Sequence, residues 1–333
     1  MAWIWTPFLS RFLHAHKLGK QIRDEKTAPI YSKLHKTKKG TPTMGGILVW
    51  ATTLIVALGF SYIALAFPDT LVSQLNFLSR SQVWLPLGAL VMAALVGLVD
   101  DYLNIRKVGP FGGGLHMRHR LMLYTLIALV GAWWFYFKLD WDILHVPFIG
   151  DFNIGWWYIP FFIFVIVATA FSVNEIDGLD GLAGGTLLPA FAAYGALAAM
   201  QGKYDLAALC GVIIGSLLAF LWLNIYPAKF IMGDTGAMSL GVTLGIVAML
   251  TNAALLLPVI GFLFVLESAS VIIQVLSKKI RKKKVFLSAP IHHHLEAIGW
   301  SEPTIVMRFW VIAFVTAIIG LIIAILERGI YYV

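Results

Sequence analysis

Nine apolar segments long enough to cross a membrane recur along the 333-residue chain. A transmembrane α-helix needs about 20 mostly apolar residues. The run at 45–67 would form a helix roughly 34 Å long at about 1.5 Å per residue. Hydrophobic residues make up 59% of the chain and charged residues 13%, which excludes an ordinary soluble domain. The predicted spans are 45–67, 83–99, 121–139, 156–173, 182–200, 206–225, 237–251, 255–276 and 304–326.

The sequence therefore predicts an all-α polytopic membrane protein with nine to ten transmembrane helices. A tenth helix would come from residues 3–13, a run too short to span a bilayer by itself. Pro258 and Glu267 interrupt the span 255–276, which predicts a helix that is kinked or broken between them. Glu267 is expected to face protein or water rather than lipid. No linker or low-complexity tract divides the chain, so residues 1–333 are expected to form one domain.

Basic residues are unevenly divided between the loops on the two sides of the predicted membrane. Lys and Arg number 19 in the loops on one side and 3 in the loops on the other. The positive-inside rule places the basic side in the cytoplasm. This topology accounts for the net charge of +8 without nucleic-acid binding. The cytoplasmic loops are then 14–44, 100–120, 174–181, 226–236 and 277–303.

Two adjacent aspartates, Asp100 and Asp101, follow the span 83–99. If the helix ends there, both carboxylates oppose the negative end of its dipole and repel one another. A bound cation or a role in proton transfer would relieve that cost. The alternative is a solvated pair at the start of a loop.

Further acidic residues lie in two glycine-containing motifs on the same side. The first is NEIDGLDG at 174–181, which places Asn174, Asp177 and Asp180 on a tight turn. The second is MGDTG at 232–236, which contains Asp234. Capping of the following helix is an alternative explanation for Asp180 and for Asp234. Asn224, just upstream of the second motif, could bind either a ligand or a neighbouring carbonyl.

Three consecutive histidines, His292, His293 and His294, follow Ala289-Pro290-Ile291. Imidazole is a good phosphate partner and proton carrier near pH 7, and the alternative is a solvated loop. The stretch at 35–46 combines cations, hydroxyls and a Gly/Pro turn, and it includes Lys36. It lacks the spacing of a nucleotide P-loop.

Together these segments resemble the polyprenyl-phosphate N-acetylhexosamine-1-phosphate transferases. The matching stretches are KTKKGTPTMGG at 36–46, LVDDY at 98–102, VNEIDGLDGLAGG at 173–185, FLWLNIYPAKFIMGDTGAMSLG at 220–241, ESASVIIQV at 267–275 and APIHHHLEAIGWSEP at 289–303. The histidine segment and GTPTMGG favour the muramoyl-pentapeptide branch of the family over the N-acetylglucosamine branch.

The resemblance implies a bacterial inner-membrane enzyme, a homodimer whose cytoplasmic site holds Mg²⁺. The implied reaction joins UDP-MurNAc-pentapeptide to undecaprenyl phosphate, giving lipid I and UMP in peptidoglycan synthesis. Asp234 is the expected metal ligand, and Asp100 and Asp101 are further candidates. Asp100 is also the expected base or nucleophile orienter. The resemblance adds His292 and His293 to the catalytic group, and it implies a nucleotide-sugar pocket of Lys36, Asn174, Asp177, Asp180, Asn224, Gln274 and His294.

Phosphoryl transfer needs charge neutralisation and positioning more than covalent chemistry, which agrees with these residue types. Two other functions remain open at this point. One is transfer from UDP-N-acetylglucosamine by the same fold, which the histidine triplet disfavours. The other is an ion-coupled transporter, which would place its ionisable groups near the membrane midplane rather than at helix ends.

Overall fold

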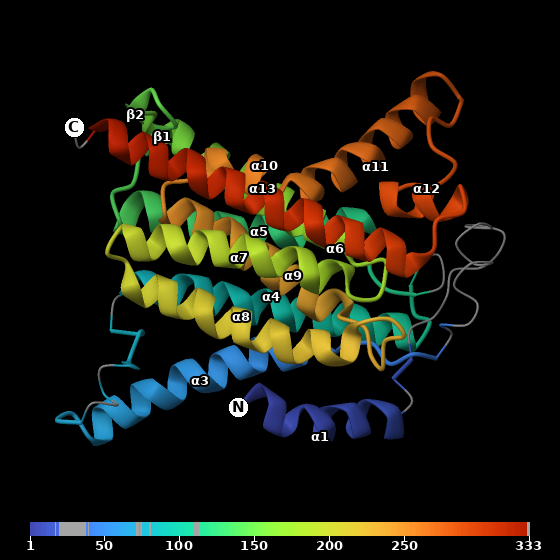
Figure 1. Ribbon diagram of the computed structural model, residues 1–333, viewed down its shortest axis with the longest axis horizontal. Coiled ribbons are helices and arrows are strands. Elements are labelled where there is room, and N and C mark those ends of the chain that lie inside the picture. Colours follow the sequence, from blue (N-terminus) through green and yellow to red (C-terminus); the bar gives the residue numbers. More distant parts are fainter. Residues whose placement is uncertain are drawn as a thin grey trace.

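A computed structural model describes residues 1–16, 18–19, 38, 40–70, 73, 75–79, 81–109 and 113–331 of the protein. Most of its long helices lie side by side along one axis, and α11 rises obliquely from them, with α12 at one end of the bundle and the β1–β2 hairpin at the other (Figure 1). The long helices are α3 (Ile47–Ala66), α4 (Ser81–Ile105), α5 (Met117–Lys138), α6 (Tyr158–Ile176), α7 (Leu182–Met200), α8 (Tyr204–Asn224), α9 (Gly233–Leu250), α11 (Phe262–Ile280) and α13 (Glu302–Tyr331). The shorter elements are α1 (Ala2–Ala15), β1 (Ile143–Val146), β2 (Gly150–Asn153), η4 (Gly155–Trp157), η5 (Ala254–Leu256), α10 (Leu257–Ile260) and α12 (Ile291–Ala297).

Eight helices of the described chain are long and apolar enough to span a membrane, and nine spans result if one bent pair counts as a span. Each matches one of the nine apolar segments, so the all-α polytopic fold is confirmed. The bent pair is Ala254–Ile260 and Phe262–Ile280, which meet at 83° across Gly261. The break lies between Pro258 and Glu267, as predicted. Within the described residues α1 has only 14 residues and supplies no tenth candidate.

Helix α9 forms the centre of the bundle. In its membrane-spanning window 94% of the residues are buried, and it packs against α4 and α6. Small residues let helix backbones approach closely in a membrane, where packing rather than the hydrophobic effect drives helix association. Gly97 of α4 shows this, because a β-carbon there would lie 2.4 Å from the carbonyl oxygen of Asp234. The close contact places the last turns of α4 against the first turn of α9.

The aspartate pair does not end its helix, and in this respect the sequence-based prediction was wrong. Helix α4 continues past Val99 to Ile105, and Asp100 and Asp101 are 0% and 3% exposed. A carboxylate near a helix C-terminus opposes the dipole of its own helix. Here that cost is offset because backbone N–H groups of other segments and an arginine surround the pair.

Candidate active site

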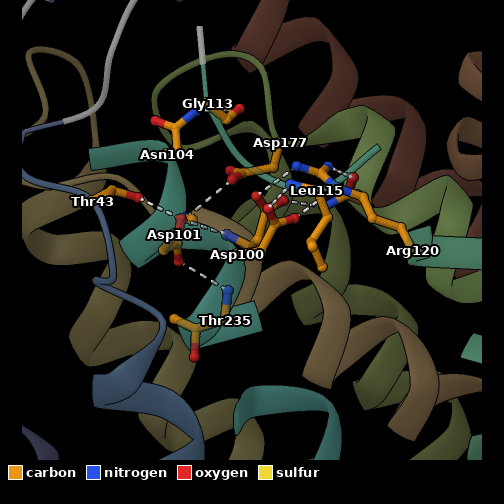
Figure 2. A network of polar contacts seen from close by, with 12 residues as sticks. Thr43, Asp100, Asp101, Asn104, Gly113, Leu115, Arg120, Asp177 and Thr235 are labelled. Carbon is orange, nitrogen blue, oxygen red and sulfur yellow. Dashed lines mark hydrogen bonds and ion pairs between the residues drawn. The ribbon is translucent and has the colours of Figure 1, made fainter. Parts of the chain in front are cut away.

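Asp101 accepts hydrogen bonds from the N-terminus of α9. Its Oδ1 accepts from the backbone N–H of Asp234 at 3.2 Å, and its Oδ2 from that of Thr235 at 3.1 Å. The hydroxyl of Thr43 donates to Oδ1 at 3.1 Å. The first N–H groups of a helix have no partner within it and favour a negative charge. Asp101 therefore caps α9 from a neighbouring helix, as Figure 2 shows for Thr43 and Thr235.

Asp100 and Asp234 meet at one guanidinium group. The Nε of Arg120 lies 2.6 Å from Asp100 Oδ2, and its Nη2 lies 3.0 Å from Asp234 Oδ2. The Nη1 of Arg120 donates to Asn174 Oδ1 at 2.9 Å, and Asn174 Nδ2 donates to Asp234 Oδ1 at 2.6 Å. The backbone N–H of Leu115 donates to Asp100 Oδ1 at 2.6 Å. Side chains from α4, α5, α6 and α9 thus form one charged network at one end of the bundle (Figure 2).

The capping explanations for Asp180 and Asp234 are wrong. Neither α7 nor α9 is capped by the side chain of its own N-cap residue, because these residues are Gly181 and Met232. The carboxylate of Asp234 contacts Arg120 and Asn174 instead, while Asp101 binds the free N–H groups of α9. The carboxylate of Asp180 also makes contacts outside its own turn.

Asp180 belongs to a second charged group that joins distant parts of the chain. The Nζ of Lys38 donates to Asp180 Oδ1 at 2.7 Å and also to Glu302. Glu302 accepts from the backbone N–H of Asp180 at 2.7 Å, and Asp180 Oδ2 accepts from that of Ala228 at 3.0 Å. Burial alone would lower the pKa of Lys38, but Glu302 and Asp180 outweigh it and the pKa is raised. The ammonium group is therefore held in its charged form.

Asp177 and Asn224 hold the loops between helices. Asp177 Oδ2 accepts from the backbone N–H of Gly233 at 3.2 Å, which ties the 177–181 turn to the start of α9. The side-chain oxygen of Asn224 accepts from Gly181 N at 3.0 Å, and its amide group donates to the Phe230 carbonyl at 2.9 Å. Asn224 is 4% exposed, so its amide holds two backbone segments together.

The other predicted pocket residues are more scattered. Gln274 is 5% exposed, and its side-chain oxygen accepts from the backbone N–H groups of Val285 and Phe286 at 2.9 and 3.0 Å. His294 accepts from the backbone N–H of Leu287 at 3.3 Å. Both therefore support the segment that leads from α11 to α12. Lys36 lies outside the described residues.

The histidine triplet is helical and partly buried, so the solvated-loop alternative is wrong. His292 to His294 lie in α12, which begins after Pro290. His292 is 0% exposed and its Nδ1 lies 3.0 Å from Glu267 Oε1. His293 is 8% exposed, and its Nδ1 lies 2.7 Å from Glu296 Oε2. Glu267 faces protein, as predicted.

The acidic residues fit a sparsely liganded Mg²⁺ ion. No group of three or more His, Cys, Asp or Glu residues in the described part of the chain is arranged to hold a metal. Mg²⁺, however, is commonly bound through one or two carboxylates together with substrate phosphates and water. Asp100 and Asp234 supply two carboxylates that converge on one cationic group. The oxygens of Asp101, in contrast, are engaged by N–H and hydroxyl donors.

Sequence reasoning missed four residues that the structure places within these networks. Arg120 and Glu302 lie in the first turns of their helices, and Thr43 and Lys38 lie in the segment before α3. Lys38 stands among several cations at 36–39, and no local pattern separates it from its neighbours. The one available signal for Arg120 and Glu302 was their position at the ends of spans that the sequence predicts to face the cytoplasm.

Comparison with known proteins agrees with this arrangement. Residues 83–252 match the family model of glycosyl transferase family 4. Residues 38–48 match phospho-N-acetylmuramoyl-pentapeptide-transferase signature 1. A phospho-N-acetylmuramoyl-pentapeptide-transferase of Chloroflexus aurantiacus is 38% identical over 95% of this chain and 84% of its own length. The transferases of that name from a Geobacillus strain and from Bartonella quintana are 39% and 38% identical, over 96% and 90% of this chain and 93% and 85% of their own lengths.

Proposed function

Because the chain belongs to the phospho-N-acetylmuramoyl-pentapeptide-transferase family, we propose that it transfers phospho-MurNAc-pentapeptide from UDP-MurNAc-pentapeptide to undecaprenyl phosphate. The products would be lipid I and UMP, in peptidoglycan synthesis. Because it belongs to this family, the protein is a membrane-embedded phosphosugar transferase. The observation that supports the finer assignment is the meeting of Asp100, Asp234, Asn174 and Arg120 at one end of the bundle.

In this reaction a phosphate oxygen of the lipid forms a bond to the sugar-linked phosphorus of the donor. The bond between that phosphorus and the oxygen of UMP breaks, and UMP leaves. The second pKa of a phosphate monoester is about 6, so the attacking oxygen needs little deprotonation at pH 7. Asp100 would orient the lipid phosphate. Arg120, 18% exposed, would contribute positive charge toward the donor diphosphate.

Asp234 and Asp100 would hold Mg²⁺, and Asp101 would set their position by fixing the start of α9. When bound, the ion supplies charge neutralisation for the phosphates. Asn174, Asp177, Asp180, His293 and His294 would contribute to the donor pocket. Asn224 and Gln274 would shape it through the loops that they hold.

We also propose that this end of the bundle faces the cytoplasm of a bacterial inner membrane and that the protein is a homodimer. The excess of Lys and Arg in the loops at 14–44, 100–120 and 277–303 supports the orientation. Single cysteines at Ser288 and Asn153 test it with a membrane-impermeant reagent, after Cys210 has been replaced. Ser288→Cys should be labelled only from the cytoplasmic side and Asn153→Cys only from the opposite side. Labelling of Asn153→Cys from the cytoplasm would overturn the orientation.

The function is tested by measuring UMP release from UDP-MurNAc-pentapeptide with and without undecaprenyl phosphate, and with and without Mg²⁺. We expect release only when lipid, donor and metal are all present. Release from UDP-N-acetylglucosamine instead would assign the chain to the other branch of the superfamily. Absence of release from both donors, with lipid-independent ion flux in vesicles, would favour a transporter. The positions of the acids at helix ends speak against that outcome.

A further inference from the structure

A glutamate and a histidine form an enclosed ion pair next to the proposed site. Glu267 lies in α11, six residues after Gly261, where the bent pair breaks, and His292 lies in α12. The side chains of both are 0% exposed, and His292 Nδ1 lies 3.0 Å from Glu267 Oε1. Neither carboxylate oxygen of Glu267 and neither ring nitrogen of His292 has a hydrogen-bond partner of good geometry within the described part of the chain, so their 3.0 Å contact is a charge contact. The pair is therefore cut off from water.

Stability does not account for such a pair. Desolvation of two charges often exceeds their mutual attraction, and apolar residues of similar volume are frequently as good or better. Burial disfavours the imidazolium, yet Glu267, with smaller contributions from Glu296 and Glu175, raises the pKa of His292. His293, the next residue along, stacks edge-on with its ring centroid 4.1 Å away. Burying these two polar side chains together therefore carries an energetic cost, which indicates a role other than packing.

The free edge of the His292 ring lies against Gly178. A β-carbon at Gly178 would lie 2.2 Å from Nε2, 2.9 Å from Cε1 and 3.2 Å from Cδ2, and all three atoms belong to His292. Gly178 is not at a positive φ, so the ring alone excludes a side chain there. The turn that contains Gly178 carries Asp177 on one side and Asp180 on the other. The imidazole therefore sets how far this turn can approach α12.

The turn reaches both charged groups of the site. Asp177 accepts from Gly233 N, one residue before Asp234, and Asp180 binds Lys38 and the Ala228 N–H. A displacement of Gly178 would move both carboxylates. Because His292 is completely covered, it reaches a substrate through this turn rather than by direct contact.

We propose that Glu267 and His292 are positioning residues, a buried support that fixes the Asp177–Asp180 turn for binding of the nucleotide-sugar donor. This inference rests on the proposed function. The proposal gives two of the three consecutive histidines different roles: His292 acts through the backbone of Gly178, whereas His293 has the more exposed ring. Glu267 holds the ring of His292 in place, and the ring in turn limits the position of the Asp177–Asp180 turn.

A double-mutant cycle tests whether Glu267 acts through His292. We expect Glu267→Gln and His292→Gln each to lower kcat/KM by about 10², mainly through a higher KM for the donor. The double variant should be no worse than the poorer single variant, because both act through one contact. Ser268→Ala is the matched control: it removes a buried hydrogen bond to Ser172 from the neighbouring position of α11. Its kinetics should stay close to those of the wild type. Independent, multiplicative effects of the two substitutions would overturn the proposal.

Adding a methyl group at Gly178 and removing the ring of His292 tests whether His292 acts through the turn. Gly178→Ala should lower the melting temperature and weaken the binding of UMP, because the methyl group collides with the ring. In a His292→Ala background the same change should have little further effect. Equal effects in both backgrounds would overturn the proposal. Melting temperature and UMP binding need no turnover, and release of UMP by the wild type tests the proposed function separately. Failure of the positioning proposal can therefore be distinguished from failure of the proposed function.

Discussion

Two histidine–carboxylate contacts lie at opposite ends of the helix bundle, and they differ in their access to water. At the proposed site, His292 and Glu267 are both 0% exposed. At the other end, His145 of β1 lies 2.6 Å from Asp151 of β2 and 2.8 Å from Glu327 of α13. Asp151 is 62% exposed and the His145 side chain 27% exposed, whereas Glu327 is only 8% exposed. The same chemical groups are therefore placed in two different dielectric environments.

The difference indicates what each contact does. The contact of His145 joins the hairpin to the end of α13, and Glu327 also accepts from the backbone N–H of Phe148 at 2.9 Å. The exposed pair of His145 and Asp151 contributes about 0–1 kcal/mol because water screens it. The contact with Asp151 therefore does little more than hold the surface hairpin in place. The enclosed pair is costly to break on one side only, since an unpaired charge is then left in the interior.

The largest expected contrast between the two ends is in catalysis. Asp234→Asn keeps the shape of the side chain but removes its charge from the Arg120–Asn174 network. We expect turnover to fall by orders of magnitude and Mg²⁺ to bind more weakly, because a metal contributes several kcal/mol of charge stabilisation. Asp142→Asn is the matched change near the hairpin, where Asp142 accepts from Asn153 at 2.7 Å. It should leave UMP release unchanged. Near-normal turnover of Asp234→Asn at low Mg²⁺ would remove Asp234 from the metal site.

A smaller contrast is expected in stability. Glu267→Leu leaves His292 without its carboxylate partner in the interior, and the free energy of unfolding should fall by about 3–5 kcal/mol. Asp151→Leu removes the exposed partner of His145 and leaves the contact between His145 and Glu327 in place, so the loss should be about 1 kcal/mol. Denaturation in detergent, followed by circular dichroism, measures both. Equal losses would mean that burial does not distinguish the two contacts.

The smallest effect concerns how the stability contributed by His145 at the hairpin depends on pH. Burial lowers the pKa of His145, but Glu327 and Asp151 outweigh it and raise the pKa. A raised folded-state pKa stabilises the protein below the unfolded value of about 6.5, and this gain is lost as the pH rises through the folded-state pKa. His145→Gln should therefore lower the melting temperature more at pH 5.5 than at pH 9. His14→Gln, on an exposed ring whose Nδ1 lies 2.7 Å from the Ser10 carbonyl oxygen, is the control. A difference in melting temperature between the wild type and His145→Gln that does not change with pH would contradict the raised pKa of His145.

Much of the architecture could be predicted from the sequence. The nine apolar segments, the break between Pro258 and Glu267 and the burial of Glu267 follow from hydropathy and from the cost of charge in lipid. The gathering of Asp100, Asp177 and Asp234 at one end follows from counting spans. These features depend on local composition, which a single sequence records.

The sequence could not show which groups pair at that end. Arg120 meets Asp234 across 114 residues, and Lys38 meets Asp180 across 142. Apolar spacing tells which end of a span a side chain occupies, but it does not tell which helices are neighbours. The extension of α4 through Asp100 and Asp101 was missed for the same reason. The donors that offset its cost lie on α9 and before α5.

The contact of Lys38 with Glu302 has a consequence for how the protein is made. Its two residues are separated by 264 positions, and Glu302 is the first residue of α13. A ribosome delivers Lys38 and Asp180 to the membrane long before that helix emerges. Until α13 is inserted, the lysine and the backbone N–H of Asp180 lack one of their carboxylate ligands. These contacts are thus completed only after α13 has been synthesised, and a chain truncated before α13 would be inserted without them.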